Sequence, residues 1–329
     1  QAIQYDKLND RINPTDGEKS GTSKLIGPII LNNSGSWLSS ISGPKAKSKA
    51  DFIRRDASNQ LILWGGEDLT REDSNTQEVF NYQTSTWTTE VPVTDFVVEA
   101  RSDHSSVLFN NYIYHWGGRK NQILKNTFTV YDSSSDAWLE NIAIAGGTAR
   151  ASHTANVYDS KMYIWGGEDN TGVLNSLEYY NFLADEWVYI GNGGTPRRGH
   201  SSVIYDNKLF FFGGEIAVNS EIELTDTIDI YDLAKGQWMV GHPSGLPLVN
   251  HQAVIDGHRM WVWGGSKGSG IYSNDLYIYD LNANTWSQGI SGGTARRYHA
   301  AASVNGILYF FGGWNGSYLS TMDRYAISK

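Results

Sequence analysis

The stretch that decides the fold is HTANVYDSKMYIWGG, residues 153–167. Small and apolar residues alternate up to a turn at 158–161, and an apolar run follows, so two short strands are predicted. The second is expected over residues 162–165, where the glycine pair ends it. A variable loop, a third strand over 177–180, a six-residue polar turn and a fourth strand from Trp187 complete the unit. The pattern predicts a four-stranded antiparallel sheet.

The same unit occurs six times along the chain. An aromatic residue followed by two glycines recurs every 47 to 52 residues, with the first glycine at 65, 117, 166, 213, 264 and 312. A tryptophan series keeps this spacing, at Trp37, Trp87, Trp138, Trp187, Trp238 and Trp286. Histidines stand 13 residues before five of the pairs, at His104, His153, His200, His251 and His299, and Phe52 has that position in the first copy. Six such units predict a ring of sheets packed face to face.

The phase of the repeat predicts how the ring closes. Trp37 precedes the first glycine pair, whereas the last pair is followed by a third strand that ends near Tyr325. The last blade is therefore expected to take three strands from residues 296–328 and its fourth from the Trp37 region. Closure of this kind removes the open edges of a linear array. Residues 1–30 lie outside the repeat and are expected to form a leader or linker, with the propeller over residues 31–329.

On these residues the chain resembles the kelch-repeat proteins, over roughly residues 35–328. The resemblance implies an all-β fold, a six-bladed kelch β-propeller whose last blade is closed by the N-terminal strand. The aromatic residues before the glycines are expected to fill the gaps between blades. The first copy departs from the pattern, because Lys49 and Phe52 stand where most other copies have Arg and His.

Composition excludes several functions. The net charge of -9, without a basic run, argues against nucleic acid or an anionic membrane as partner, and no segment has the length and apolarity to insert into a membrane. The chain has no Cys, which removes disulfides, thiolate metal sites and Cys nucleophiles. We expect no metal and no cofactor. A Cys-free chain rich in Trp and Gly suits an exported bacterial protein, and a start at Gln1 without Met suggests either a processed secretory precursor or an excised fragment. We expect an extracellular or periplasmic location with processing at Gln1.

The loops that enter strand one and leave strand two share one face of a propeller, and loops on a rigid scaffold are where function usually lies. In substrate-adaptor kelch propellers, which the chain resembles in its repeat, these loops hold peptides. Here they also offer Glu67, Asp103, Arg198 and Arg297. The side chains expected to contact a ligand are Arg101, Arg119, Arg150, Glu168, Arg197, Glu215, Arg296, Tyr298, Trp314 and Tyr318.

Two of these assignments have a second interpretation. The repeated arginines 101, 150, 197 and 296 would equally serve as structural donors to loop carbonyls. The Arg and Glu residues around the rim would equally pair with one another. The repeated histidines are expected to be structural, because residues spread around a ring do not converge on one metal.

Trp314 is the residue that most favours ligand binding. It has no place in the repeat and follows the last glycine pair in GGWNGSYLS, residues 312–320. We expect its ring near the mouth of the central channel, close to Tyr318, where it would stack on a sugar or a peptide side chain. The alternative is that the ring packs on its own loop.

The sequence favours a non-catalytic recognition module for a glycan or a peptide. One alternative is an enzyme acting on a carboxylated sugar, similar to the sialic-acid epimerase-like propellers, which use Arg, Glu and His in the central cleft. Another is a structural component of an extracellular assembly, with self-assembly through the N-terminal leader. The copper radical oxidases are excluded, because their cross-linked Cys is missing.

Overall fold

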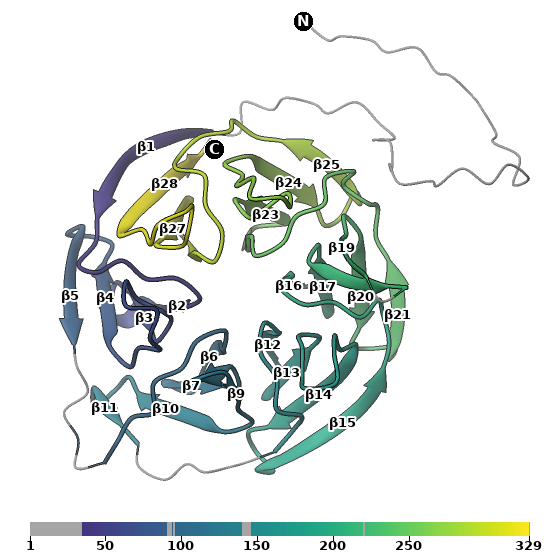
Figure 1. The fold of residues 1–329 in the computed structure, drawn as a ribbon, viewed down its shortest axis with the longest axis horizontal. Coiled ribbons are helices and arrows are strands. Elements are labelled where there is room, and N and C mark those ends of the chain that lie inside the picture. Colours follow the sequence, from purple (N-terminus) through teal and green to yellow (C-terminus); the bar gives the residue numbers. More distant parts are fainter. Residues whose placement is uncertain (1–34, 91–93, 95, 140–145, 220, 329) are drawn as a thin grey trace, which may run out of the picture.

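The computed structural model describes residues 35–328, except for 91–93, 95, 140–145 and 220. The leader expected over residues 1–30 lies outside them. Six antiparallel four-stranded sheets surround a central axis (Figure 1), so the chain is the predicted six-bladed propeller. Within the described residues, no helix is both long and apolar enough to cross a membrane.

Each blade runs from an innermost to an outermost strand. The innermost strands line the axis and are β2 (Asp51–Arg55), β6 (Ser105–Phe109), β12 (Thr154–Tyr158), β16 (Ser201–Tyr205), β22 (Gln252–Asp256) and β26 (Ala300–Val304). The second strands are β3 (Gln60–Trp64), β7 (Tyr112–Trp116), β13 (Lys161–Trp165), β17 (Lys208–Phe212), β23 (Arg259–Trp263) and β27 (Ile307–Phe311). The third are β4 (Gln77–Asn81), β10 (Phe128–Asp132), β14 (Ser176–Asn181), β20 (Ile228–Asp232), β24 (Leu276–Asp280) and β28 (Thr321–Ile327). The outermost are β5 (Thr86–Glu90), β11 (Ala137–Trp138), β15 (Glu186–Asn192), β21 (Gln237–Val240), β25 (Thr285–Gln288) and β1 (Gly35–Ser42).

Two extra hairpins extend from the loops between second and third strands. They are β8 (Arg119–Lys120) with β9 (Ile123–Leu124) in the second blade, and β18 (Glu215–Val218) with β19 (Glu221–Leu224) in the fourth. Because strands in a blade alternate in direction, these loops lie at the same end as the loops that enter the innermost strands. We call this end the loop face.

Aromatic side chains join neighbouring blades, as the sequence predicts. The residue before each glycine pair is at most 1% exposed, and it contacts the outer-strand tryptophan of the next blade. The six ring pairs have centroids 4.5 to 5.5 Å apart: Trp64–Trp138, Trp116–Trp187, Trp165–Trp238, Phe212–Trp286, Trp263–Trp37 and Phe311–Trp87. One repeated contact therefore holds all six interfaces together.

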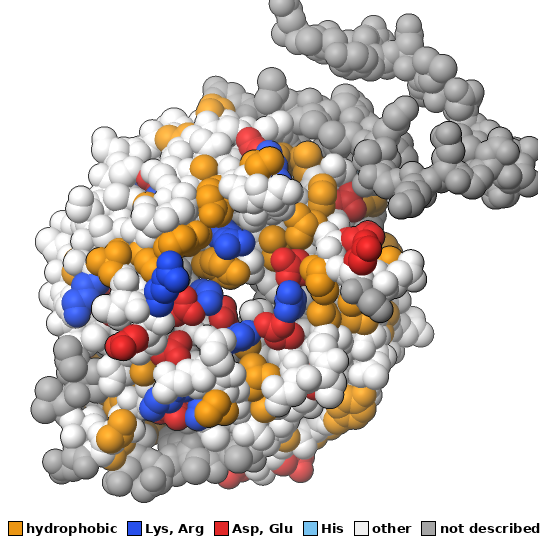
Figure 2. Space-filling model, in the orientation of Figure 1, with side chains coloured by type: hydrophobic (Ala, Val, Ile, Leu, Met, Phe, Trp, Pro, Cys, Tyr) orange, Lys and Arg blue, Asp and Glu red, His pale blue; other side chains and the backbone are white. Residues whose placement is uncertain are grey.

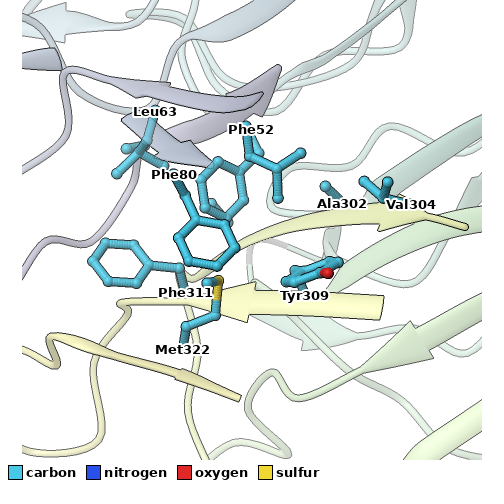
Figure 3. Close-up of a cluster of buried hydrophobic side chains, with 11 residues drawn as sticks. Phe52, Leu63, Phe80, Ala302, Val304, Tyr309, Phe311 and Met322 are labelled. Carbon is cyan, nitrogen blue, oxygen red and sulfur yellow. The ribbon is translucent and has the colours of Figure 1, made fainter. Parts of the chain in front are cut away.

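The two ends of the chain close the ring. β1 pairs antiparallel with β28, so the last blade has the order β1-β28-β27-β26 (Figure 1), as predicted. The sixth blade then packs on the first through a buried cluster that includes Phe52, Phe80, Tyr309 and Phe311 (Figure 3). This interface joins residues more than 200 positions apart, so the ring depends on contacts of high sequence separation.

The first blade corrects two sequence assignments. Ala50, not Phe52, has the histidine position, because its Cβ lies against the second glycine of its blade as that of His104 does. Lys47, not Lys49, has the arginine position, and it is buried beside Glu78. The shift arises because a 3-10 turn at Asp56–Ser58 lengthens the β2–β3 hairpin. Counting back from the glycines therefore selects the wrong residues in this blade.

Candidate functional site

A central cavity of about 230 Å³ opens among the innermost strands. Its wall is polar, with hydroxyl groups from Ser105, Ser152, Thr154, Ser201 and Ser202. Figure 2 shows positive and negative side chains gathered around the central opening. We call the side chains around this opening on the loop face the mouth.

A circle of backbone hydrogen bonds frames the mouth. Six residues, one before each innermost strand, donate their N–H to the carbonyl of the equivalent residue in a neighbouring blade at 2.8 to 3.1 Å. They are Lys49, Asp103, Ser152, Gly199, Asn250 and Tyr298, and all have φ between 55° and 61°. Non-glycine residues adopt this left-handed conformation at an energetic cost, which the closed circle offsets. All six N–H groups are therefore used within the circle, so a ligand at the mouth depends mainly on side chains for its hydrogen-bond donors.

Ion pairs span the mouth over the first four blades. Lys49 Nζ lies 2.6 Å from Glu67 and 3.6 Å from Asp103, and Arg119 lies 3.3 Å from that same Asp103. Arg119 and Arg198 then share Glu168, with Arg119 at 2.6 Å. Arg198 also contacts Glu215, at 2.8 Å. The seven side chains alternate in sign, so their charges are largely satisfied within the protein.

The network shifts the pKa values of its members. Burial raises the pKa of Asp103, and the neighbouring Lys49 and Arg119 only partly oppose this. For Lys49, burial acts downward but Asp103 and Glu67 outweigh it, so its pKa rises to about 12. The pKa of Glu168 is lowered, because Arg119 and Arg198 together exceed the effect of burial. Lys49 therefore stays charged at neutral pH.

The fifth and sixth blades complete the mouth differently. Trp314 and Tyr318 meet edge to face with ring centroids 4.9 Å apart, and the indole N–H donates to the hydroxyl of Tyr272 at 3.2 Å. The Arg297 guanidinium lies over Tyr272 at 5.7 Å and over Tyr298 at 4.8 Å. We call these five residues the aromatic corner. Trp314 is half-buried, so both interpretations of its position hold in part: its ring is at the mouth and packs on its own loop.

Four predicted ligand contacts lie in the interior instead. Arg101, Arg150, Arg197 and Arg296 are at most 1% exposed, and each donates to the carbonyl of the first glycine in its own blade. Three of them also pair with a third-strand carboxylate: Arg150 with Glu178, Arg197 with Asp229 and Arg296 with Asp323. Their side chains do not reach the mouth, so we leave them out of the candidate site. They are structural donors to loop carbonyls, which is the second interpretation that the sequence allowed.

A signal in the sequence could have separated three of these arginines, Arg150, Arg197 and Arg296, from the mouth. The third strands have Glu78, Glu178, Asp229 and Asp323 at equivalent positions, in the same four blades whose buried position is Lys47, Arg150, Arg197 or Arg296. The fifth blade lacks both charges, with Leu248 and Tyr277. The cation and the acid are thus present or absent together in five of the six blades, which indicates a buried pair. In the second blade Arg101 has Thr129 at the position of the acid, and its guanidinium donates to that hydroxyl at 2.8 Å.

The repeated histidines are also interior residues. Each ring lies edge-on to the aromatic residue of a neighbouring blade, with centroids 5.0 to 5.2 Å apart. His153, His200 and His251 contact a hydroxyl group at 2.8 to 3.0 Å. Burial lowers the pKa of all five, to about 3 for His104 and His251, so they are neutral. Within the described residues, no group of three or more His, Cys, Asp or Glu side chains is arranged to hold a metal ion.

Six of the ten predicted ligand residues do meet at the mouth: Arg119, Glu168, Glu215, Tyr298, Trp314 and Tyr318. The structure adds Lys49, Tyr272 and Arg297 to them, together with Asp51 inside the cavity. Tyr272 lies in a variable loop, where no repeat position identified it. Arg297 directly follows the buried Arg296, and only its side-chain direction distinguishes the two.

Asp51 leads to a prediction of pH-dependent stability. Its carboxylate lines the cavity and accepts the N–H groups of Phe52 and Ser106 at 2.9 and 3.2 Å. Burial outweighs both bonds and raises its pKa from 3.8 to about 6. Native Asp51 thus holds its proton more tightly than in the unfolded chain. Its contribution to the free energy of unfolding falls as pH rises from about 4 to 6.

We expect Asp51→Asn to remove that decrease and to stabilise the protein at pH 7 by up to about 3 kcal/mol, since each unit of pKa shift corresponds to about 1.4 kcal/mol. Urea unfolding of both proteins across pH 4 to 7 measures this. Parallel pH profiles for wild type and variant would show that Asp51 does not titrate in this range.

Comparisons with known proteins agree with the architecture. A family model described as an Attractin/LZTR1 beta-propeller matches residues 61–322. The match begins in β3 and ends in β28, so it includes all of the mouth except Lys49. A search of curated proteins found no match.

Proposed function

Because the chain belongs to the Attractin/LZTR1 β-propeller family, we propose that it is a non-catalytic recognition module whose ligand docks at the mouth. The observation that supports this is the asymmetry of the mouth. Ion pairs satisfy one another over four blades, whereas the aromatic corner presents half-buried rings and a guanidinium. Tyr, Trp and Arg are the residue types that contribute most to binding energy in protein interfaces.

A peptide or protein is the ligand we favour. Aliphatic residues stand at the tips of four loops on the loop face: Leu69, Ile123, Ile222 and Ile271 are 51 to 70% exposed. Exposed aliphatic side chains around a polar centre suit a protein surface. We further propose, from composition, that the chain acts outside the cytoplasm.

A glycan is the second candidate, and the aromatic corner is the observation that favours it. Trp and Tyr rings with nearby hydroxyl groups suit stacking on a sugar face. The two candidate ligands differ in the part of the loop face that they would contact. A glycan would depend on the aromatic corner alone, whereas a protein would also contact the loop tips.

The test is binding of the labelled protein to a peptide array and to a glycan array. We expect the double variant Trp314→Ala/Tyr318→Ala to lose about tenfold or more of the affinity, because loss of an interface anchor commonly removes 2 kcal/mol or more. Tyr189→Ala is the matched control, since Tyr189 is 60% exposed on the outermost strand β15, and β13 and β14 separate it from the innermost strand β12. Equal binding by wild type and double variant on both arrays would refute the assigned face.

A further inference from the structure

The fourth blade shows how this fold binds a carboxylate at the mouth. Arg198 pairs with Glu215 through backbone hydrogen bonds of 3.0 and 2.9 Å, which fix its position next to the glycine pair. Its side chain then contacts two carboxylates, Glu215 of its own blade and Glu168 of the preceding one. An arginine at this position thus lies where two acidic groups can reach it.

Arg297 has the same backbone position in the sixth blade. It pairs with Trp314 through hydrogen bonds of 3.0 and 2.8 Å, the same pattern as Arg198 with Glu215. The two positions that hold carboxylates around Arg198 hold Trp314 and Ser266 here. No described carboxylate lies within ion-pair distance of Arg297, and its buried Nε has no hydrogen-bond partner among the described residues.

Arg297 differs from the other cations of the mouth in the groups that it contacts. The other three cations, Lys49, Arg119 and Arg198, each contact two acidic side chains. Arg297 instead lies over two tyrosine rings, which attract its charge through their faces and leave its N–H donors available. A guanidinium binds carboxylates through paired N–H donors, and these bonds are about twice as strong as neutral ones.

We infer that Arg297 is the subsite for a carboxylate of the ligand, supplied by an acidic side chain of a peptide segment. This inference rests on the proposed function and names the chemistry that the mouth selects. The carboxylate takes the place that Glu168 has beside Arg198, where the fifth blade has the smaller Ser266, while the aromatic corner contacts the adjacent apolar part of the ligand. The aliphatic loop tips favour a peptide segment of a larger protein over an acidic sugar.

The experiment uses short random peptides with acetylated and amidated ends, in matched pairs. In each pair the second peptide has Asn or Gln in place of every Asp or Glu. We expect wild-type protein to bind acidic peptides about ten- to a hundredfold more tightly than their amide partners, because a charged hydrogen bond is lost. Arg297→Gln should bind both members equally, whereas the control Arg54→Gln, which changes an exposed arginine near the end of β2 away from the loop face, should keep the preference.

The other outcomes distinguish a failure of peptide recognition from a failure of the carboxylate subsite. If wild-type protein binds no peptide, the proposed peptide recognition fails together with the subsite. If it binds peptides without preferring the acidic member, recognition stands and the carboxylate subsite is refuted. A preference that survives Arg297→Gln, in a variant with unchanged thermal unfolding, places the subsite elsewhere. Acidic oligosaccharides that bind only the wild type would overturn the peptide as the source of the carboxylate.

Discussion

Removal of residues 1–42 is expected to abolish cooperative unfolding of the propeller. This truncation deletes β1, the outermost strand of the sixth blade, and leaves the edge of β28 without its partner. It also removes Trp37, whose ring contacts Trp263 at 5.5 Å and Tyr325 at 5.2 Å, and whose indole N–H donates to the Ile290 carbonyl at 2.7 Å. A lost tryptophan alone commonly reduces stability by about 3–5 kcal/mol. Because the free energy of unfolding of a domain is only about 5–15 kcal/mol, the stability lost with the whole strand is expected to exceed it.

The matched control is removal of residues 1–34, which keeps β1. We expect this shorter truncation to unfold cooperatively by circular dichroism and the longer one to aggregate through its open edge. Trp37→Ala tests the packing contribution with the strand in place. Cooperative unfolding of the 1–42 truncation at the temperature of the control would show that five complete blades and one three-stranded blade suffice.

Arg150→Ala is expected to destabilise the protein by about 3–5 kcal/mol, because it leaves the carboxylate of Glu178 buried without its charge partner. The arginine also donates to the Gly166 carbonyl at 3.0 Å and to Ser176 Oγ at 2.9 Å, so polar groups of two further residues lose a partner. Urea unfolding followed by tryptophan fluorescence measures the difference.

Two further variants serve as controls for Arg150→Ala. Arg54→Ala breaks an exposed ion pair with Asp56 and should change stability by at most about 1 kcal/mol. Arg150→Met/Glu178→Leu replaces both charges and should recover part of the loss, because no unpaired charge remains buried. If Arg150→Ala and Arg54→Ala had equal effects, the buried pair would not stabilise the blade.

The sequence predicted the blades because their spacing is a local property. An aromatic residue, two glycines and a later tryptophan specify where strands end, and the phase of Trp37 against Tyr325 specifies the closing strand. The same counting misplaced Lys49 and Phe52, since the longer β2–β3 hairpin moved the inner residues by two positions. Spacing is therefore reliable only where hairpin lengths are equal.

The candidate site could be predicted only in part. The positions of Arg119, Glu168 and Trp314 in the loops predicted that they lie at the mouth, because every second loop of a propeller emerges on the same face. It could not separate Arg197 from Arg198, or Arg296 from Arg297, which are adjacent residues of one type. One of each pair points into the blade and the other toward the mouth, because successive side chains along an extended chain face opposite sides.

By itself, then, the sequence determined the number of blades, their strand order and the way the ring closes, since each follows from a periodic pattern of packing residues. The tertiary structure alone decided which charges remain for a ligand. That depends on pairs formed between blades, such as Arg119 with Glu168, and on the absence of such a pair at Arg297 within the described residues. Contacts between blades join residues about fifty positions apart, and no local spacing specifies which side chains will meet there.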